Sequence, residues 1–168
     1  HGQLYMFRAL EHYERFAQSA RILMINLKKT PQELVDLTGD LLKRSGIQSD
    51  AYIRPMGYKS DEVIGGRLHD LHDEMYSTVQ PFGNYIDIDR ALNVGVSSWK
   101  RVDDNMIPAR GKITGAYVNS AFAKTEAVLN GFDEAIMLDN EGHVSEGSAE
   151  NLFMFRNGVA YTPPVTSN

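Results

Sequence analysis

One lysine of the sequence stands in a setting that suits nucleophilic chemistry. Lys112 lies in the stretch RGKITG (110–115), between glycines and just ahead of a segment with helical spacing. A positive charge is unfavourable near a helix N-terminus, so this placement together with burial would lower the pKa of the amine. A neutral amine could form a Schiff base, and a charged one could contact phosphate. The alternative is a solvated loop lysine, because lysine is rarely buried.

Two carboxylates lie close together in a stretch of small residues. The segment GHVSEGSAENLFMF (142–155) holds Glu146 and Glu150, with only glycine, serine and alanine between them. Small residues would let this chain pack closely against something flat. A carboxylate buried there needs a partner, because burial of an isolated charge is costly. A protonated heterocycle nitrogen could be that partner, and the alternative interpretation is a solvated turn.

A third group of polar residues resembles a metal site only weakly. His69 and His72 stand three residues apart in RLHDLHDE (67–74), beside three acidic residues. Histidine and carboxylate are zinc ligands, but this spacing alone does not define a site. We therefore expect an exposed polar loop and no metal. The sequence also has no nucleotide-type glycine motif and no GxSxG nucleophile motif.

The composition limits the class of protein and of partner. Hydrophobic residues make up 42% and charged residues 23% of the 168 residues, which is typical of a soluble globular protein. The net charge of −5 argues against nucleic acid or an anionic membrane as the main partner. Cysteine is absent, which excludes disulfides and thiolate metal sites and suits a reducing cytoplasm. No apolar run is long enough for a membrane span, and the N-terminal segment lacks the apolar region of a signal peptide.

Hydrophobic spacing and turn residues predict a mixed α+β chain. Helices are expected over 10–24, from a capping residue at Thr30 to a stop at Gly46, and over 116–130. Strands are expected over 4–7, 51–56, 75–79, 92–99, 134–138, 152–155 and 159–161. A tight turn at 157–158 should join the last two strands, in a β meander that begins at 134. The chain starts without Met in a strand-like run and stops in a loop-like one, so we expect that neither end is a natural terminus.

Four stretches of the sequence form a common pattern. They are EHYERFAQSARIL (11–23), AYIRP (51–55), VSSWKRVDDNMIPARGK (96–112) and KITGAYVNSAFAKTEAVLNGFDEAIMLDNEGHVSEGSAENLF (112–153). They resemble the branched-chain amino acid aminotransferases, which are pyridoxal-phosphate enzymes of the fold-type IV class. The resemblance implies a two-lobed α+β fold of which this chain holds only part. Residues 1–81 would be the remainder of the small N-terminal domain, 82–90 the interdomain linker, and 91–168 the first part of the larger C-terminal domain with the cofactor lysine.

The resemblance also implies a role for each residue that matches the cofactor site. Lys112 matches the lysine that forms the internal aldimine with pyridoxal 5'-phosphate and then moves the proton. Glu146 matches the carboxylate that faces the pyridine nitrogen, and Tyr117 matches the tyrosine that hydrogen-bonds the phenolic oxygen. Arg15 matches an arginine that holds the phosphate. Glu150 matches a second acid near the cofactor.

Four further residues match the family's substrate pocket. Tyr52, Arg54 and Tyr85 match residues around it, and Phe82 stands where the family often has tryptophan. Tyrosine and phenylalanine could line the apolar part of a pocket for an aliphatic side chain. Arg54 could meet the second carboxylate of a dicarboxylic substrate.

The resemblance implies transamination of leucine, isoleucine or valine with 2-oxoglutarate, in two half-reactions through a pyridoxamine form. It implies a cytoplasmic homodimer or higher homo-oligomer whose other partners are amino acids and 2-oxo acids. A D-amino acid transaminase or aminodeoxychorismate lyase of the same fold is the nearest alternative, and AYIRP and GSAENLF argue against it. A non-catalytic cofactor- or metal-binding domain is the second alternative. The joint presence of Lys112, Tyr117 and Glu146 argues against that.

Overall fold

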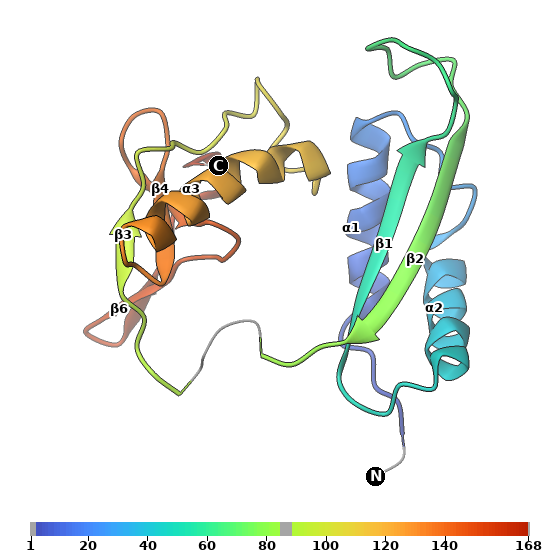
Figure 1. The fold of residues 1–168 in the computed structure, drawn as a ribbon, viewed down its shortest axis with the longest axis horizontal. Helices are drawn as coiled ribbons and strands as arrows, with labels where there is room; N and C mark the ends of the chain where they lie inside the picture. Colours follow the sequence, from blue (N-terminus) through green and yellow to red (C-terminus); the bar gives the residue numbers. More distant parts are fainter. Residues whose placement is uncertain (1–2, 85–88, 168) are drawn as a thin grey trace. The chain divides into compact units, whose positions relative to one another are not determined.

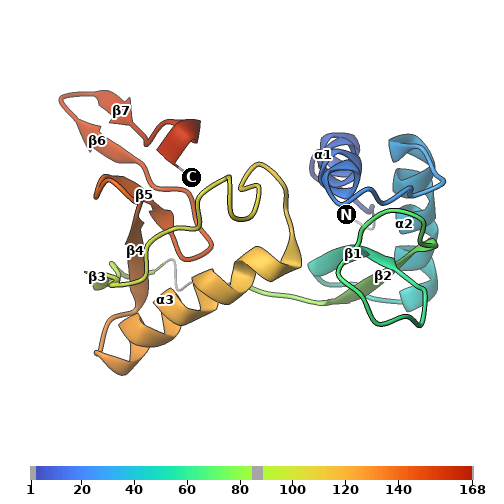
Figure 2. The same cartoon turned by 90° about the horizontal axis from the view of Figure 1, so that it is seen from above.

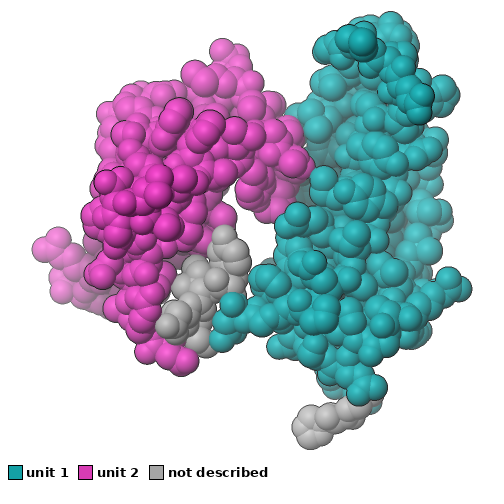
Figure 3. Space-filling view, in the orientation of Figure 1, with its two compact units in different colours: residues 1–87 teal, residues 88–168 magenta. Residues whose placement is uncertain are grey.

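The structure is a computed structural model that describes residues 3–84 and 89–167. It divides into two compact units, His1–Asp87 and Ile88–Asn168, which Figure 3 colours separately. Each unit contains helices and strands (Figure 1), so the predicted α+β class is confirmed. The division falls within the stretch expected as a linker. That the units are the small and the larger domain of the family stays a prediction.

Two helices of the first unit pack side by side. α1 (Ala9–Ile22) buries Tyr13 and Ala20. α2 (Pro31–Ser45) begins with the predicted capping box, in which Thr30 and Glu33 exchange hydrogen bonds, and ends at Gly46 with φ +68°. The hydroxyls of Tyr13 and Thr38 form a buried hydrogen bond that joins the two helices.

The first unit also contains a two-stranded antiparallel sheet. β1 (Ala51–Lys59) pairs with β2 (Asp73–Pro81), with Ala51 opposite Pro81 and Lys59 opposite Asp73. The helices lie on one side of the two strands in Figure 2. A Cβ on Gly57 would lie only 3.1 Å from Leu27 and 3.6 Å from Phe16, so glycine permits this close packing. Tyr52 and Arg54 lie at alternate positions of β1 and therefore on the opposite face, away from the helices.

The second unit is built on a three-stranded sheet with one helix. β3 (Val94–Val96) pairs in parallel with β4 (Glu134–Leu138), and β4 pairs antiparallel with β5 (Val144–Gly147). A short 3₁₀ helix, η1 (Thr114–Ala116), leads into α3 (Tyr117–Leu129). The core cluster of this unit lies between α3 and β4. Ala123 and Ala127 of α3 belong to it with Ala135 and Met137 of β4, and of these only Ala127 has any exposed surface.

The last strands form a separate hairpin. β6 (Met154–Arg156) and β7 (Val159–Tyr161) pair antiparallel, and η2 (Val165–Ser167) follows them. Asn157 and Gly158 have φ of 51° and 76°, which is the conformation that a tight two-residue hairpin requires. The predicted turn at this position is therefore confirmed. None of the helices that the structure describes is both long enough and apolar enough to cross a bilayer.

Several predicted strands are wrong in extent or in existence. Residues 4–7 form no strand, because they have no strand partner in the first unit. The strand expected over 92–99 is limited to Val94–Val96, and the one expected over 152–155 begins at Met154. β5 was not predicted, since its glycine and serine content favours a turn. As a result the C-terminal part is two separate antiparallel pairs and not one continuous meander.

Candidate active site

Lys112 stands at the end of the loop that leads to α3. Two tight backbone hydrogen bonds hold this part of the loop: Gly111 N–H donates to Pro108 O at 3.0 Å, and Ile113 N–H donates to Gly111 O at 2.9 Å. η1 and α3 follow directly, so the predicted position ahead of a helix is confirmed. The side chain of Lys112 is exposed in its unit, so the described residues of that unit do not supply the burial considered for it.

The amine of Lys112 is held by the first residue of α3. Lys112 Nζ donates a hydrogen bond to the hydroxyl of Tyr117, and it lies 5.0 Å from the centroid of the same ring. The first turn of α3 carries no acidic side chain, and no side chain caps it. The positive end of the helix is therefore not neutralised by a side chain of its own first turn. Tyr117 thus fixes the position of the Lys112 amine.

Glu146 lies on β5 opposite the buried Met137, and its side chain is only 19% exposed. It forms an ion pair with Arg101, whose side chain is 13% exposed. Burial raises the pKa of Glu146 above its usual value; the positive charges of Arg101 and Lys112 oppose this rise and the negative charge of Glu150 adds to it. The partner found for this carboxylate is therefore an arginine of the same unit.

Arg101 reaches Glu146 because the chain after β3 is fastened to both β4 and α3. Arg101 N–H donates to Leu138 O at 2.8 Å, which continues the pairing with β4. Trp99 stacks on Phe122 of α3, with ring centroids 4.6 Å apart. Asn119 of α3 donates to the carbonyl of the residue before Arg101 at 2.9 Å. These contacts fix the backbone from which the guanidinium extends.

Glu150 occupies the room that the small residues leave. Gly147 N–H donates to Glu150 O at 2.7 Å, and Ala149 N–H donates to Glu150 Oε2 at 3.0 Å. A Cβ on Gly147 would lie only 2.8 Å from Glu150 Oε2. We expected small residues here so that the chain could approach something flat; at Gly147 it is Glu150 that requires the space. Glu150 Oε1 is buried and has no hydrogen-bond partner among the described residues.

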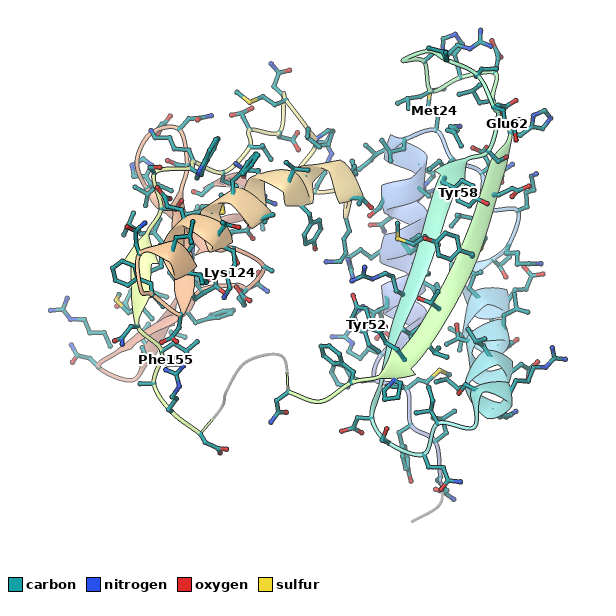
Figure 4. The ribbon with its side chains drawn as sticks, viewed as in Figure 1. Met24, Tyr52, Tyr58, Glu62, Lys124 and Phe155 are labelled. Carbon is teal, nitrogen blue, oxygen red and sulfur yellow. The ribbon has the colours of Figure 1, made fainter. Side chains whose placement is uncertain are left out.

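The first unit brings together three of the residues assigned to the substrate pocket. The rings of Tyr52 and Phe82 have centroids 5.2 Å apart, and the guanidinium of Arg54 lies 5.3 Å from the centroid of Tyr52. In Figure 4 the side chains of Tyr52 and Tyr58 lie along β1. Tyr58 is also at an even-numbered position of the strand and is 40% exposed, so it extends the same aromatic face.

Two other predicted residues are not placed in these clusters. Arg15 lies on α1 and is exposed, and its guanidinium lies 3.1 Å from the ring nitrogen Nδ1 of His12. Tyr85 lies outside the described residues. The cluster around Tyr52 belongs to the first unit, and the cluster around Lys112 belongs to the second.

The histidines considered as metal ligands have other surroundings. His72 Nδ1 lies 2.9 Å from Asp61 Oδ1, and the His72 backbone N–H also donates to Asp61. His69 lies on the exposed loop, 3.9 Å from the carboxylate of Asp70. Within residues 3–84 and 89–167, no three histidine, aspartate or glutamate side chains come together as a metal site.

Arg101 is the residue that the sequence did not identify as functional. It stands in a polar stretch, KRVDDN (100–105), and nothing in that stretch distinguishes it from a solvated arginine. Its position depends on the strand order β3-β4-β5, which brings residues 101 and 146 together across β4. To identify Arg101, the sequence would have had to predict the strand β5, because that strand places Glu146 in the sheet.

Each of these clusters has chemical abilities of its own. Lys112 can add to a carbonyl carbon and can afterwards accept or donate a proton. Glu146 and Glu150 together carry more negative charge than Arg101 neutralises, so they favour a cation such as a protonated ring nitrogen. In the first unit, Arg15 and Arg54 are both exposed, so each could bind an anionic group of a ligand. The role of each residue stays a prediction.

Comparison with known proteins gives a consistent result. The amino-transferase class IV family matches residues 2–168. A probable branched-chain-amino-acid aminotransferase of Aquifex aeolicus is 48% identical over 161 residues, which are 96% of this chain and 52% of that protein. This chain thus spans about half the length of the relatives it matches.

Two crystal structures are also close to it. The branched-chain aminotransferase of Thermoproteus uzoniensis with norvaline has a TM-score of 0.94 and 39% identity, over 99% of this chain and 56% of that one. The T.th. branched-chain amino acid aminotransferase, complexed with N-(5'-phosphopyridoxyl)-L-glutamate, has a TM-score of 0.88 and 38% identity, over 96% of this chain and 54% of that one. With the family matching almost the whole sequence, this chain belongs to the amino-transferase class IV family.

Proposed function

We propose that the protein is a branched-chain amino acid aminotransferase that uses pyridoxal 5'-phosphate and transfers the amino group of leucine, isoleucine or valine to 2-oxoglutarate. The observation that carries this proposal is the hydrogen bond from Lys112 Nζ to Tyr117, at the start of α3 and in the unit that also holds the largely buried Glu146. The relatives named branched-chain aminotransferases support the substrate class. The chain's coverage of about half their length makes the whole activity a proposal.

The residues present fit pyridoxal phosphate. Its aldehyde requires an amine, and Lys112 supplies one next to a hydroxyl. Its ring nitrogen requires a carboxylate, and Glu146 lies largely buried near Glu150, whose Oε1 lacks a hydrogen-bond partner among the described residues. Its phosphate requires a cation, for which Arg15 is exposed on α1. When bound, the cofactor supplies an electron sink for the negative charge that develops at the substrate Cα.

The protein's own residues then supply acid–base chemistry and orientation. Lys112 Nζ would accept the proton that leaves the substrate Cα and, once protonated, would be the acid for the next proton transfer. Tyr117 holds that amine in position through its hydroxyl. Glu146, as a carboxylate, stabilises a positive charge on the ring nitrogen, which strengthens the electron sink.

The aromatic face of β1 supports an aliphatic side chain as part of the substrate. Tyr52 and Phe82 form an apolar surface at a ring separation of 5.2 Å. Arg54, over the ring of Tyr52, offers a cationic group for the second carboxylate of 2-oxoglutarate. The glutamate moiety bound to the T.th. enzyme supports a dicarboxylic substrate.

The surroundings of the protein are part of the same proposal. We place it in the cytoplasm, because a sequence without cysteine suits a reducing compartment. We also propose a homodimer or higher homo-oligomer. The aromatic face of the β1–β2 sheet offers exposed apolar surface that could contact a ligand or another subunit. On it, Tyr76 is 50% and Tyr58 is 40% exposed.

A matched pair of lysine variants tests this proposal on the full-length protein. Lys112→Ala should abolish transfer from leucine, isoleucine and valine to 2-oxoglutarate. Lys100→Ala is the control, because Lys100 lies in the same unit and donates to the Asn140 carbonyl at 2.8 Å, away from Tyr117. Unchanged turnover in Lys112→Ala would contradict the proposal. Chiral analysis of the amino acid consumed separates it from a D-amino acid transaminase, and release of pyruvate from aminodeoxychorismate would indicate the lyase.

A further inference from the structure

Arg101 is largely buried at a point where its charge has few partners among the described residues. Its side chain is 13% exposed, and its ion-pair partner is Glu146. Another nitrogen of the guanidinium, Nη1, is buried without a hydrogen-bond partner among the described residues. Desolvation of a cation costs free energy unless a nearby negative charge offsets it. Glu146 is the negative charge that the guanidinium contacts.

Glu146 would be difficult to keep ionised without Arg101. It is largely buried, and Glu150 adds a second negative charge nearby. Both conditions favour the protonated form of a carboxylate. The positive groups that act on it are Arg101 and Lys112, and Lys112 is already bound to Tyr117. A protonated Glu146 could not stabilise a positive ring nitrogen.

We propose that Arg101 is the positioning residue of Glu146: its guanidinium holds this carboxylate in place and in the charged form that the ring nitrogen of the cofactor requires. This inference rests on the proposed function, since that function gives Glu146 its role. Arg101 itself acts through Glu146 and touches neither the substrate nor the reacting atoms.

The backbone around Arg101 supports a fixed position. Its N–H is bonded to Leu138 O at 2.8 Å, and Trp99, two residues earlier, is stacked against α3. The side chain therefore starts from an anchored point at the end of β4 and crosses to β5. A lysine at this position would keep the charge but not the planar donor group, so Arg101→Lys should retain only part of the effect.

The test uses the full-length protein with Arg101→Met, Arg101→Lys, Glu146→Gln and the double variant Arg101→Met/Glu146→Gln. Arg90→Met is the matched control, because Arg90 pairs with Asp133 at 2.6 Å at the other end of the β3–β4 pair. The first readout is the carboxyl infrared band of Glu146 in the cofactor-free protein, identified by its loss in Glu146→Gln. Arg101→Met should raise the titration midpoint of that band by about 1–3 pH units, as expected for loss of an adjacent opposite charge. Arg90→Met should leave it unchanged.

The second readout is the affinity of the cofactor-free protein for pyridoxal phosphate. Arg101→Met should weaken it by about tenfold to a hundredfold, the range typical of losing a group that supports a ligand-binding side chain. In the Glu146→Gln background the same change should cost less than about twofold, because two residues that act as one unit are not additive. Arg101→Lys keeps the positive charge, so its affinity for pyridoxal phosphate should lie between those of the wild type and Arg101→Met.

The outcomes separate this inference from the proposed function. A wild-type midpoint in both Arg101→Met and Arg101→Lys, or equal affinity losses in both Glu146 backgrounds, would overturn the role of Arg101 and leave the aminotransferase intact. A wild-type protein that binds no pyridoxal phosphate would overturn the proposed function. The infrared titration would then still decide whether Arg101 keeps Glu146 ionised.

Discussion

Gly147 should tolerate no side chain, because it lies between the two acids of the candidate site. In Gly147→Ala the new Cβ would lie 2.8 Å from Glu150 Oε2 and 3.1 Å from Glu150 O. The side chain could rotate away, but the backbone oxygen is held by the 2.7 Å hydrogen bond from Gly147 N–H. Overpacking of this kind costs about 1–3 kcal/mol. Loss of the hydrogen bond from Ala149 to Glu150 Oε2 adds about 1 kcal/mol, so we expect a total of about 2–4 kcal/mol.

Equilibrium urea unfolding of the cofactor-free protein, followed by the fluorescence of Trp99, measures this cost in the relevant unit. Trp99 is the one tryptophan of the printed sequence and is stacked on α3. Gly115→Ala is the matched control, since nothing lies within 4 Å of a Cβ there and its φ is not in the left-handed range. It should change the free energy of unfolding by less than about 1 kcal/mol.

A second background identifies the contact responsible. In Glu150→Ala the clash with Oε2 is absent, so the cost of Gly147→Ala should fall by at least about 1 kcal/mol. The clash with the backbone oxygen remains. Equal stability of Gly147→Ala and Gly115→Ala would refute the argument that Glu150 requires glycine at this position. An undiminished cost in the Glu150→Ala background would refute the assignment to Oε2.

Three further predictions concern the elements that support the site. Gly95→Ala should destabilise the second unit by about 1–3 kcal/mol, because its Cβ would lie 2.6 Å from the ring of Phe132, and Phe132→Leu should relieve part of the cost in urea unfolding. Thr30→Ala should lose the capping box and cost about 1 kcal/mol, measurable as a lower thermal midpoint. The hydrogen bond from Lys59 lowers the pKa of Asp73. The stability that ionised Asp73 contributes is thus complete above the unfolded pKa of about 3.9 and is lost as pH falls through the lower folded pKa. Asp73→Asn should therefore weaken the fall of the free energy of unfolding at acid pH. An unchanged fall in this variant would contradict the prediction.

The sequence predicts best the elements whose signals are local. The start of α2 follows from Thr30 and Pro31, because a capping hydroxyl and a proline satisfy the first turn whatever packs against it. The turn at 157–158 follows in the same way, since asparagine and glycine adopt positive φ most readily. The pair Lys112 and Tyr117 is also local, at five residues apart along one loop and helix start.

The sequence does not predict features that depend on strand order. β5 contains Ser145, Glu146 and Gly147, which are poor strand formers, and it exists because β4 offers an unpaired edge. The contact of Arg101 with Glu146 depends on that pairing and spans 45 residues, so no local pattern marks it. The sequence left Glu146 open between a buried carboxylate and a solvated turn, and it gave no indication that Arg101 would be its partner.

The most direct test of the central claim is reduction with borohydride after pyridoxal phosphate has been added to the full-length protein, followed by peptide mapping by mass. We expect a pyridoxyl group on Lys112. Lys112→Ala should lose it, and Lys100→Ala should keep it. A pyridoxyl group on a different lysine would contradict the site, and none on a folded wild-type protein would contradict the assignment as a pyridoxal-phosphate aminotransferase.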